Sequence, residues 1–85
     1  MSSRDANKGS FAIVTGASSG IGLELARCCA ASGFDLLIAA DEPAIEAAAR
    51  ELRSSNVQVE ALQVDLSTME GVDRLYAAAE TRLAR

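Results

Sequence analysis

A glycine-rich run at residues 15–22 (TGASSGIG) follows directly on the apolar stretch at residues 11–14 (FAIV). An apolar run bounded by glycines is typical of a buried parallel strand, and the residues after Gly22 show helical spacing. A strand, a glycine turn and a helix in this order gather backbone N–H groups around the positive end of a helix dipole. The sequence therefore predicts a phosphate or pyrophosphate site at this turn.

The three glycines of this run, Gly16, Gly20 and Gly22, have separable roles. One allows the tight turn, one lets the backbone approach a ligand, and one lets the helix pack close to the strand. Their spacing, Gly-x-x-x-Gly-x-Gly, differs from the Gly-x-Gly-x-x-Gly of the standard dinucleotide fingerprint. The structural alternative is a glycine-rich turn that binds no ligand.

Strand and helix patterns alternate three times along the 85 residues. Strands are expected at residues 10–15, 36–40 and 57–64, and the first helix at residues 20–31 with Gly33 as its stop. Pro43 is expected as the first residue of the second helix, with Asp41 or Glu42 as its cap. Ser67 and Glu70 predict a capping box for the third helix. The fold class is therefore α/β: a partial Rossmann-like, doubly wound parallel sheet (βαβαβα) of three layers with strand order 3-2-1.

Apolar spacing predicts which face each helix buries. The expected inward residues are Ile21, Leu25, Cys28 and Cys29 in the first helix, Ile45, Ala48, Ala49 and Leu52 in the second, and Val72, Leu75, Tyr76, Ala79 and Leu83 in the third.

Composition excludes several classes of function. The net charge is −4 and the basic residues do not cluster, so neither nucleic acid nor an anionic membrane is expected as a partner. Residues 1–9 predict a flexible, polar N-terminus without a signal peptide, and no run is long enough to span a bilayer. Cys28 and Cys29 are adjacent and histidine is absent, so we expect no disulfide and no metal site, and the two thiols indicate a reducing cytoplasm.

The whole string TGASSGIG after a hydrophobic strand resembles the cofactor motif of the short-chain dehydrogenase/reductase family. The resemblance implies that Gly16, Gly20 and Gly22 hold the pyrophosphate of NAD(P), mainly through backbone donors. Ser18 and Ser19 would add hydroxyl hydrogen bonds to phosphate or ribose, or else cap the helix. Ile21 would pack beneath the cofactor or into the core.

The resemblance also assigns roles to residues after the second and third strands. Asp41 would accept hydrogen bonds from the adenosine ribose and repel a 2′-phosphate, which favours NAD over NADP; its alternative is to cap the second helix. Asp65 would contact the adenine amino group, or compete with Ser67 to cap the third helix, and Leu66 would flank the adenine ring.

The resemblance covers residues 11–85, which correspond to about the first third of a typical family member and end before a fourth strand. The family's Tyr-x-x-x-Lys pair has no match, because Tyr76 is followed four residues later by Glu80 and the sole lysine is Lys8. We therefore expect cofactor-binding residues but no catalytic residue at residues 10–85. Two alternatives are a stand-alone dinucleotide-binding module and an interaction module. An exposed edge of the first strand would predict self-association or a partner chain that completes the sheet.

Overall fold

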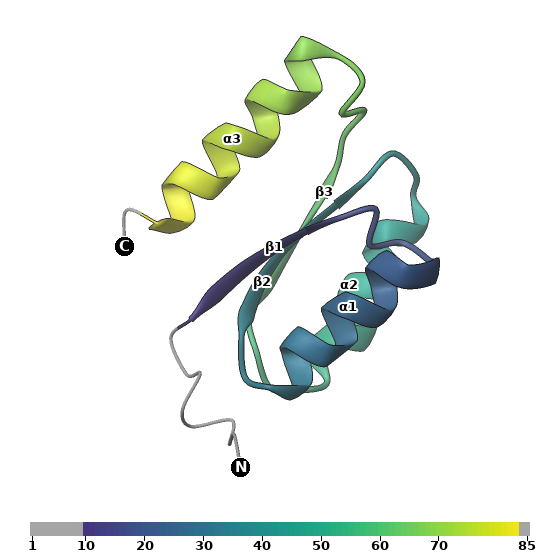
Figure 1. Ribbon diagram of the computed structural model, residues 1–85, viewed down its shortest axis with the longest axis vertical. Helices are drawn as coiled ribbons and strands as arrows, with labels where there is room; N and C mark the ends of the chain where they lie inside the picture. The colour runs from purple at the N-terminus through teal and green to yellow at the C-terminus, as the bar shows by residue number, and fades with distance from the viewer. Residues whose placement is uncertain (1–9, 84–85) are drawn as a thin grey trace.

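The computed structural model describes residues 10–83, where three strands and three helices alternate (Figure 1). The elements are β1 (Phe11–Thr15), α1 (Gly20–Ala31), β2 (Asp35–Ala40), α2 (Ala44–Arg53), β3 (Val59–Gln63) and α3 (Met69–Leu83). All pairings are parallel in the order β1-β2-β3, which is the predicted 3-2-1 arrangement. The flexible segment predicted at residues 1–9 lies outside the described residues.

The sheet forms the middle of three layers. Helices α1 and α2 cover one face and α3 lies on the other, as Figure 1 shows. Because side chains alternate along a strand, β2 sends Leu36, Ile38 and Ala40 into the core under α1 and α2. Leu37 and Ala39 point to the opposite face and are also fully buried. A strand buried on both faces explains the continuous apolar run of β2.

Helix α2 confirms its predicted buried face. Ile45, Ala48, Ala49 and Leu52 are all buried, and the helix ends before Ser54 as expected. Its start differs from the prediction, because Pro43 occupies the N-cap position with helical angles (φ −61°) and makes no side-chain capping bond. The first turn is instead closed by the backbone, where the Ile45 N–H donates to the Glu42 carbonyl at 3.2 Å. The predicted capping by Asp41 or Glu42 side chains is therefore wrong.

Helix α1 has the predicted bounds but buries a different face. Ala26 and Ala30 are fully buried, whereas Ile21 is 85% exposed, Leu25 is 56% exposed and Cys28 is exposed. Small side chains four residues apart let the helix lie close to the sheet. The larger apolar side chains consequently point away from it, and of the predicted set only Cys29 packs against the core. The helix ends at Ala31, and Gly33 follows its C-cap Ser32 with a φ of +93°, which suits a glycine just beyond a helix C-terminus.

Helix α3 begins one residue later than the predicted capping box implies. The Thr68 hydroxyl accepts a hydrogen bond from the Gly71 N–H at 3.0 Å, so Thr68 caps the helix. The predicted Ser67–Glu70 box is wrong because the Ser67 side chain donates to Asp65 instead. A Cβ on Gly71 would lie 1.9 Å from the Asp65 carbonyl oxygen, so the start of α3 packs directly against the backbone that follows β3.

The buried face of α3 is narrower than predicted. Leu75 and Ala79 are partly buried, but Val72 is 39% exposed and Tyr76 is 67% exposed. Tyr76 is therefore not a core residue. It lies on the side of α3 that no other element within residues 10–83 covers. The Leu83 side chain lies outside the described part.

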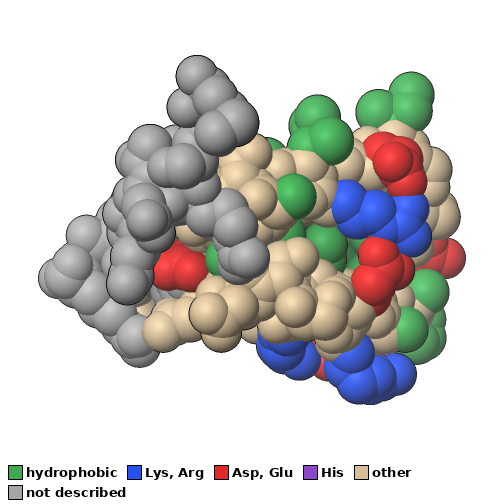
Figure 2. Space-filling view, turned by 90° about the horizontal axis from the view of Figure 1, so that it is seen from below, with side chains coloured by type: hydrophobic (Ala, Val, Ile, Leu, Met, Phe, Trp, Pro, Cys, Tyr) green, Lys and Arg blue, Asp and Glu red, His purple; other side chains and the backbone are tan. Residues whose placement is uncertain are grey.

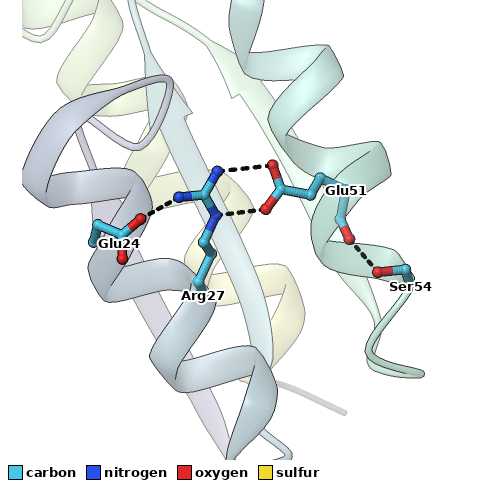
Figure 3. A network of polar contacts seen from close by, with 4 residues as sticks. All are labelled: Glu24, Arg27, Glu51 and Ser54. Carbon is cyan, nitrogen blue, oxygen red and sulfur yellow. Dashed lines mark hydrogen bonds and ion pairs between the residues drawn. The ribbon is translucent and has the colours of Figure 1, made fainter.

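A charged network joins α1 to α2 on the surface (Figure 3). Arg27 donates to Glu51 through Nε at 2.5 Å and Nη2 at 3.0 Å, and it also pairs with Glu24. These hydrogen bonds hold the pKa of Glu51 below its ordinary value. Exposed pairs of this kind stabilise a fold only slightly, so we expect the network to contribute little to the free energy of unfolding.

The face drawn in Figure 2 has apolar side chains at the surface, with acidic and basic side chains interspersed among them. Within residues 10–83, no helix combines the length and apolar character that crossing a membrane requires.

Candidate functional site at the carboxyl ends of the strands

The three loops that leave the carboxyl ends of the strands meet at one edge of the sheet. Two backbone bonds hold them there: Ala17 N–H to the Ala39 carbonyl at 3.3 Å, and Val64 N–H to the Ala40 carbonyl at 3.0 Å. Between the loops lies an open cleft of about 350 Å³, lined by Gly16, Ser18, Ser19, Ala40, Asp41, Glu42, Val64 and Leu66. This is the edge at which parallel α/β sheets bind their ligands.

The glycine turn has the geometry that its sequence predicts. Gly16 and Gly20 have φ values of +65° and +61°, which L-amino acids with a Cβ adopt only with strain. Gly22 meets a different requirement, because a Cβ there would lie 2.1 Å from the Gly16 carbonyl oxygen. Gly16 and Gly20 thus allow the positive φ angles of the turn, and Gly22 lets the start of α1 pack against the turn backbone.

The N-terminus of α1 carries no side-chain cap. Ser19 stands at the N-cap position with extended backbone, but its hydroxyl makes no capping bond. The first turn of α1 contains no acidic residue, whereas α2 has Glu46 and α3 has Glu70 there. The first N–H groups of a helix lack partners within it, and they mark the positive end of its dipole. This end of α1 is therefore suited to an anion.

Ser18 contacts the second loop of the cleft. Its hydroxyl donates a hydrogen bond to Oε1 of Glu42, which follows β2. The alternative in which Ser18 or Ser19 caps α1 is therefore wrong, since neither side chain bonds to the first turn. The Ser18–Glu42 contact instead joins the glycine turn to the β2–α2 loop.

Asp41 lines the cleft, and its carboxylate makes no hydrogen bond to any residue within 10–83. The side chain is exposed, and it forms no ion pair within these residues either. Val64 and Leu66 supply an apolar wall to the same cleft. A free carboxylate next to an apolar wall can accept hydrogen bonds from ligand hydroxyls while a flat ring packs beside it.

Asp65 does not line the cleft, although the neighbouring Val64 and Leu66 do. Its Oδ1 accepts two hydrogen bonds from Ser67, from the N–H at 2.9 Å and from the hydroxyl at 2.6 Å. Both bonds stabilise the ionised form, so they hold the pKa of Asp65 below its ordinary value, the hydroxyl having the larger effect. Asp65 forms a turn before α3, where Thr68 provides the cap.

The lowered pKa of Asp65 predicts a pH dependence of stability. The turn contributes fully above the ordinary carboxyl pKa, near pH 4, and its contribution is lost as the pH falls through the lower folded value. Asp65→Asn should flatten the acid limb of the stability curve below about pH 4. It should leave the pH dependence above pH 6 unchanged, because Asp65 is ionised there in both the folded and the unfolded chain. Urea melts of both proteins across this range measure the difference. Identical acid limbs would contradict the assigned role.

Ile21 lies apart from this cleft. It borders a second depression, of about 460 Å³, on the outer surface of α1 with Leu25 and Cys28. The prediction that Ile21 enters the core is wrong, for the reason given above for α1. Its contact with a cofactor stays a prediction.

Sequence reasoning missed three residues that line the cleft. Ala40, Glu42 and Val64 join Gly16, Ser18, Ser19, Asp41 and Leu66 there. The signal for Ala40 and Val64 was their place at or just beyond the end of a strand. Glu42 follows Asp41 directly, and its sequence context indicates only a helix cap.

A model of the family described as short chain dehydrogenase matches residues 10–85. The chain belongs to the short-chain dehydrogenase family. Among curated members, the fatty acyl-CoA reductase of Acinetobacter baylyi is 37% identical over 73 residues, which are 85% of this chain and 25% of that protein. The 1-deoxy-11-beta-hydroxypentalenate dehydrogenase of Streptomyces exfoliatus is 41% identical over 85% of this chain and 26% of its own length. This short-chain dehydrogenase chain thus spans about a quarter of these relatives.

Solved structures of the family agree with the fold. L-sorbose reductase from Gluconobacter frateurii, complexed with NADPH and L-sorbose, superposes with a TM-score of 0.83 at 36% identity, over 87% of this chain and 29% of that one. A short-chain dehydrogenase/reductase from Burkholderia phymatum in complex with NAD gives 0.83 at 29% identity, over 92% of this chain and 28% of that one. Among the solved relatives of this chain, one is therefore in complex with NADPH and another with NAD.

Proposed function

We propose that this chain is the N-terminal, cofactor-binding part of a short-chain oxidoreductase that exchanges hydride between NAD(P) and an alcohol or carbonyl. The observation that carries the proposal is the cleft at the strand ends, which combines an uncapped helix N-terminus with a free carboxylate. Both groups match what a dinucleotide presents, a pyrophosphate and ribose hydroxyls.

Different residues of the cleft would bind different groups of the cofactor. The turn at Gly16, Gly20 and Gly22 and the first N–H groups of α1 would hold the pyrophosphate, with Ser19 beside it. Asp41 would accept hydrogen bonds from the adenosine ribose, and Leu66 would flank the adenine. Asp65 lies between the cleft-lining Val64 and Leu66, and its Oδ2, which accepts neither bond from Ser67, would accept a hydrogen bond from the adenine amino group.

When bound, the nicotinamide supplies or accepts the hydride. We assign no catalytic residue to residues 10–83. The exposed Tyr76 stands on α3 with Glu80, and not a lysine, four residues later. The proton-transferring groups would come from a part of the protein beyond these residues. Cys28 and Cys29 are free thiols, which supports a reducing cytoplasm as its compartment.

We infer a preference for NAD over NADP from the charges of the cleft. Asp41 and Glu42 both line it, and within residues 10–83 no lysine or arginine does. A ribose hydroxyl can donate to a carboxylate, whereas a 2′-phosphate would be repelled by it.

Substituting Asp41 tests the proposal. Asp41→Asn should weaken NADH binding about tenfold, since the neutral amide oxygen still accepts but loses part of the roughly 1.5–3 kcal/mol that a hydrogen bond to a charged group contributes. Asp41→Arg should reverse the preference, because it replaces a repulsion by an attraction for the 2′-phosphate. Fluorescence titrations with NADH and NADPH measure both effects. Glu46→Gln, in the first turn of α2, is the matched control and should leave both affinities unchanged. Unaltered cofactor affinities in both Asp41 variants would refute the assignment.

A second candidate is favoured by the position of β1. This strand stands at one edge of the described sheet, and Ile13 on it is 44% exposed. Such an edge fits a non-catalytic module that binds the dinucleotide and pairs with another chain. Activity and binding assays on the native protein discriminate between the two candidates. Turnover of an alcohol or carbonyl would support the oxidoreductase, and NADH binding without turnover would support the binding module.

A further inference from the structure

We propose that Arg53 protects the outer edge of β3 from pairing with the same strand of a second copy of this chain. The inference goes beyond the proposed function and does not depend on it. It concerns the edge of the sheet opposite β1, because within residues 10–83 the strand β3 pairs only with β2. An edge strand presents N–H and C=O groups to which another chain can add a strand.

The backbone groups of β3 point alternately toward β2 and toward the outer edge. Before the strand, the Gln58 carbonyl accepts from the Leu36 N–H at 2.8 Å, and after it the Val64 N–H donates to β2 at 3.0 Å. Because the N–H and C=O groups of successive residues alternate in direction, the even-numbered residues of β3 face β2. The outward row of backbone groups therefore belongs to Val59, Ala61 and Gln63.

Arg53 covers the first carbonyl of this outward row. It is the last residue of α2, and its Nη2 and Nε donate to the Val59 carbonyl oxygen at 2.8 Å and 3.2 Å. A donor at this distance stands where the N–H of an added strand would have to be. Neighbouring strands lie about 4.7–4.9 Å apart, so the guanidinium also occupies part of the space that such a strand needs.

The outward row is self-complementary in an antiparallel pair. When Ala61 lies opposite Ala61 of a second copy, Val59 lies opposite Gln63, and these two residues exchange both backbone bonds. Glu60 then lies opposite Leu62, so like charges do not oppose each other. The pairing requires the Val59 carbonyl as an acceptor, and Arg53 already occupies it. Arg53 therefore blocks a pairing that the rest of the edge permits.

Removing the guanidinium should strengthen self-association. Arg53→Met removes the donors and keeps an apolar side chain. We expect the dissociation constant of the 85-residue chain to fall about tenfold, because each copy regains a backbone acceptor at its edge. Arg50→Met, at an exposed position of the same helix, makes the same change in charge and should not alter the constant. Sedimentation equilibrium over a concentration series measures it, and association through β1 is common to all these proteins.

A second substitution locates the pairing. Gln63→Pro removes the outward N–H that would donate to the uncovered Val59 carbonyl, at an exposed edge position where proline is tolerated. Added to Arg53→Met, it should return the dissociation constant to that of the unchanged chain. Aggregation caused by misfolding would not be reversed in this way. Association of Arg53→Met no tighter than that of Arg50→Met would overturn the proposal, as would tighter association that persists after Gln63→Pro.

Discussion

Gly22→Ala should lower the free energy of unfolding by about 3 kcal/mol, the upper part of the range for overpacking a closely packed site. The added Cβ would lie 2.1 Å from the Gly16 carbonyl oxygen, 2.7 Å from its carbon and 3.1 Å from the Thr15 carbonyl oxygen. All three atoms belong to the backbone, so no side-chain rotation can relieve the overlap. Either α1 or the glycine turn must move, and the same movement should abolish cofactor binding.

Gly20→Ala is the matched control. A Cβ at this position has no atom within 4 Å, although φ is +61°. The substitution should therefore cost only the strain of a left-handed alanine, about 1 kcal/mol. Urea unfolding followed by circular dichroism measures both variants. A Gly22→Ala protein as stable as Gly20→Ala would contradict the close approach of α1.

Gly71→Ala should also destabilise the fold, by about 2–3 kcal/mol. Within a helix this change ordinarily stabilises by about 0.5–1 kcal/mol, so the expected sign is reversed. The reason is the Asp65 backbone, whose carbonyl oxygen would lie 1.9 Å and whose carbon would lie 2.7 Å from the new Cβ. Relief would require the start of α3 to withdraw from the end of β3.

Asp73→Ala, two residues further along α3 at an exposed position, serves as the control for helix propensity. It should leave stability unchanged or raise it by a few tenths of a kcal/mol, as alanine does at exposed helix positions. Urea unfolding of the two variants gives the comparison. A stabilising Gly71→Ala would show that α3 is free to move away from the loop after β3.

Helix faces were predictable where side-chain size and burial agree. In α2 the large apolar residues Ile45 and Leu52 are also the buried ones, so the helical spacing identified the correct face. In α1 the buried positions Ala26 and Ala30 are small, and the larger Ile21 and Leu25 point outward. A spacing argument weighted by side-chain size selects the wrong face in such a helix, because close approach requires small residues.

The candidate site was predictable where the ligand-binding groups are contiguous in sequence. The glycine turn and Asp41 follow their strands directly, so their meeting at one edge follows from parallel topology. The Ser18–Glu42 hydrogen bond spans 24 residues and depends on how two loops face each other. Likewise, Gly71 could not be identified from sequence, because the backbone that it approaches precedes the helix and bends back over it. The sequence predicts Ser67 as the cap of α3, but the Ser67 hydroxyl donates to Asp65 and the Thr68 hydroxyl accepts from the Gly71 N–H, so the cap lies one residue later.

The most direct test of the account is a residue-resolved NMR titration of the 85-residue chain with NADH. The account predicts that amide shifts change in the glycine turn at residues 16–22, at Asp41 and Glu42, and at Leu66, with α3 beyond its first turn unaffected. This pattern would locate the dinucleotide in the cleft at the strand ends. No shift at millimolar NADH, or changes centred on the outer surface of α1 or on α3, would contradict it.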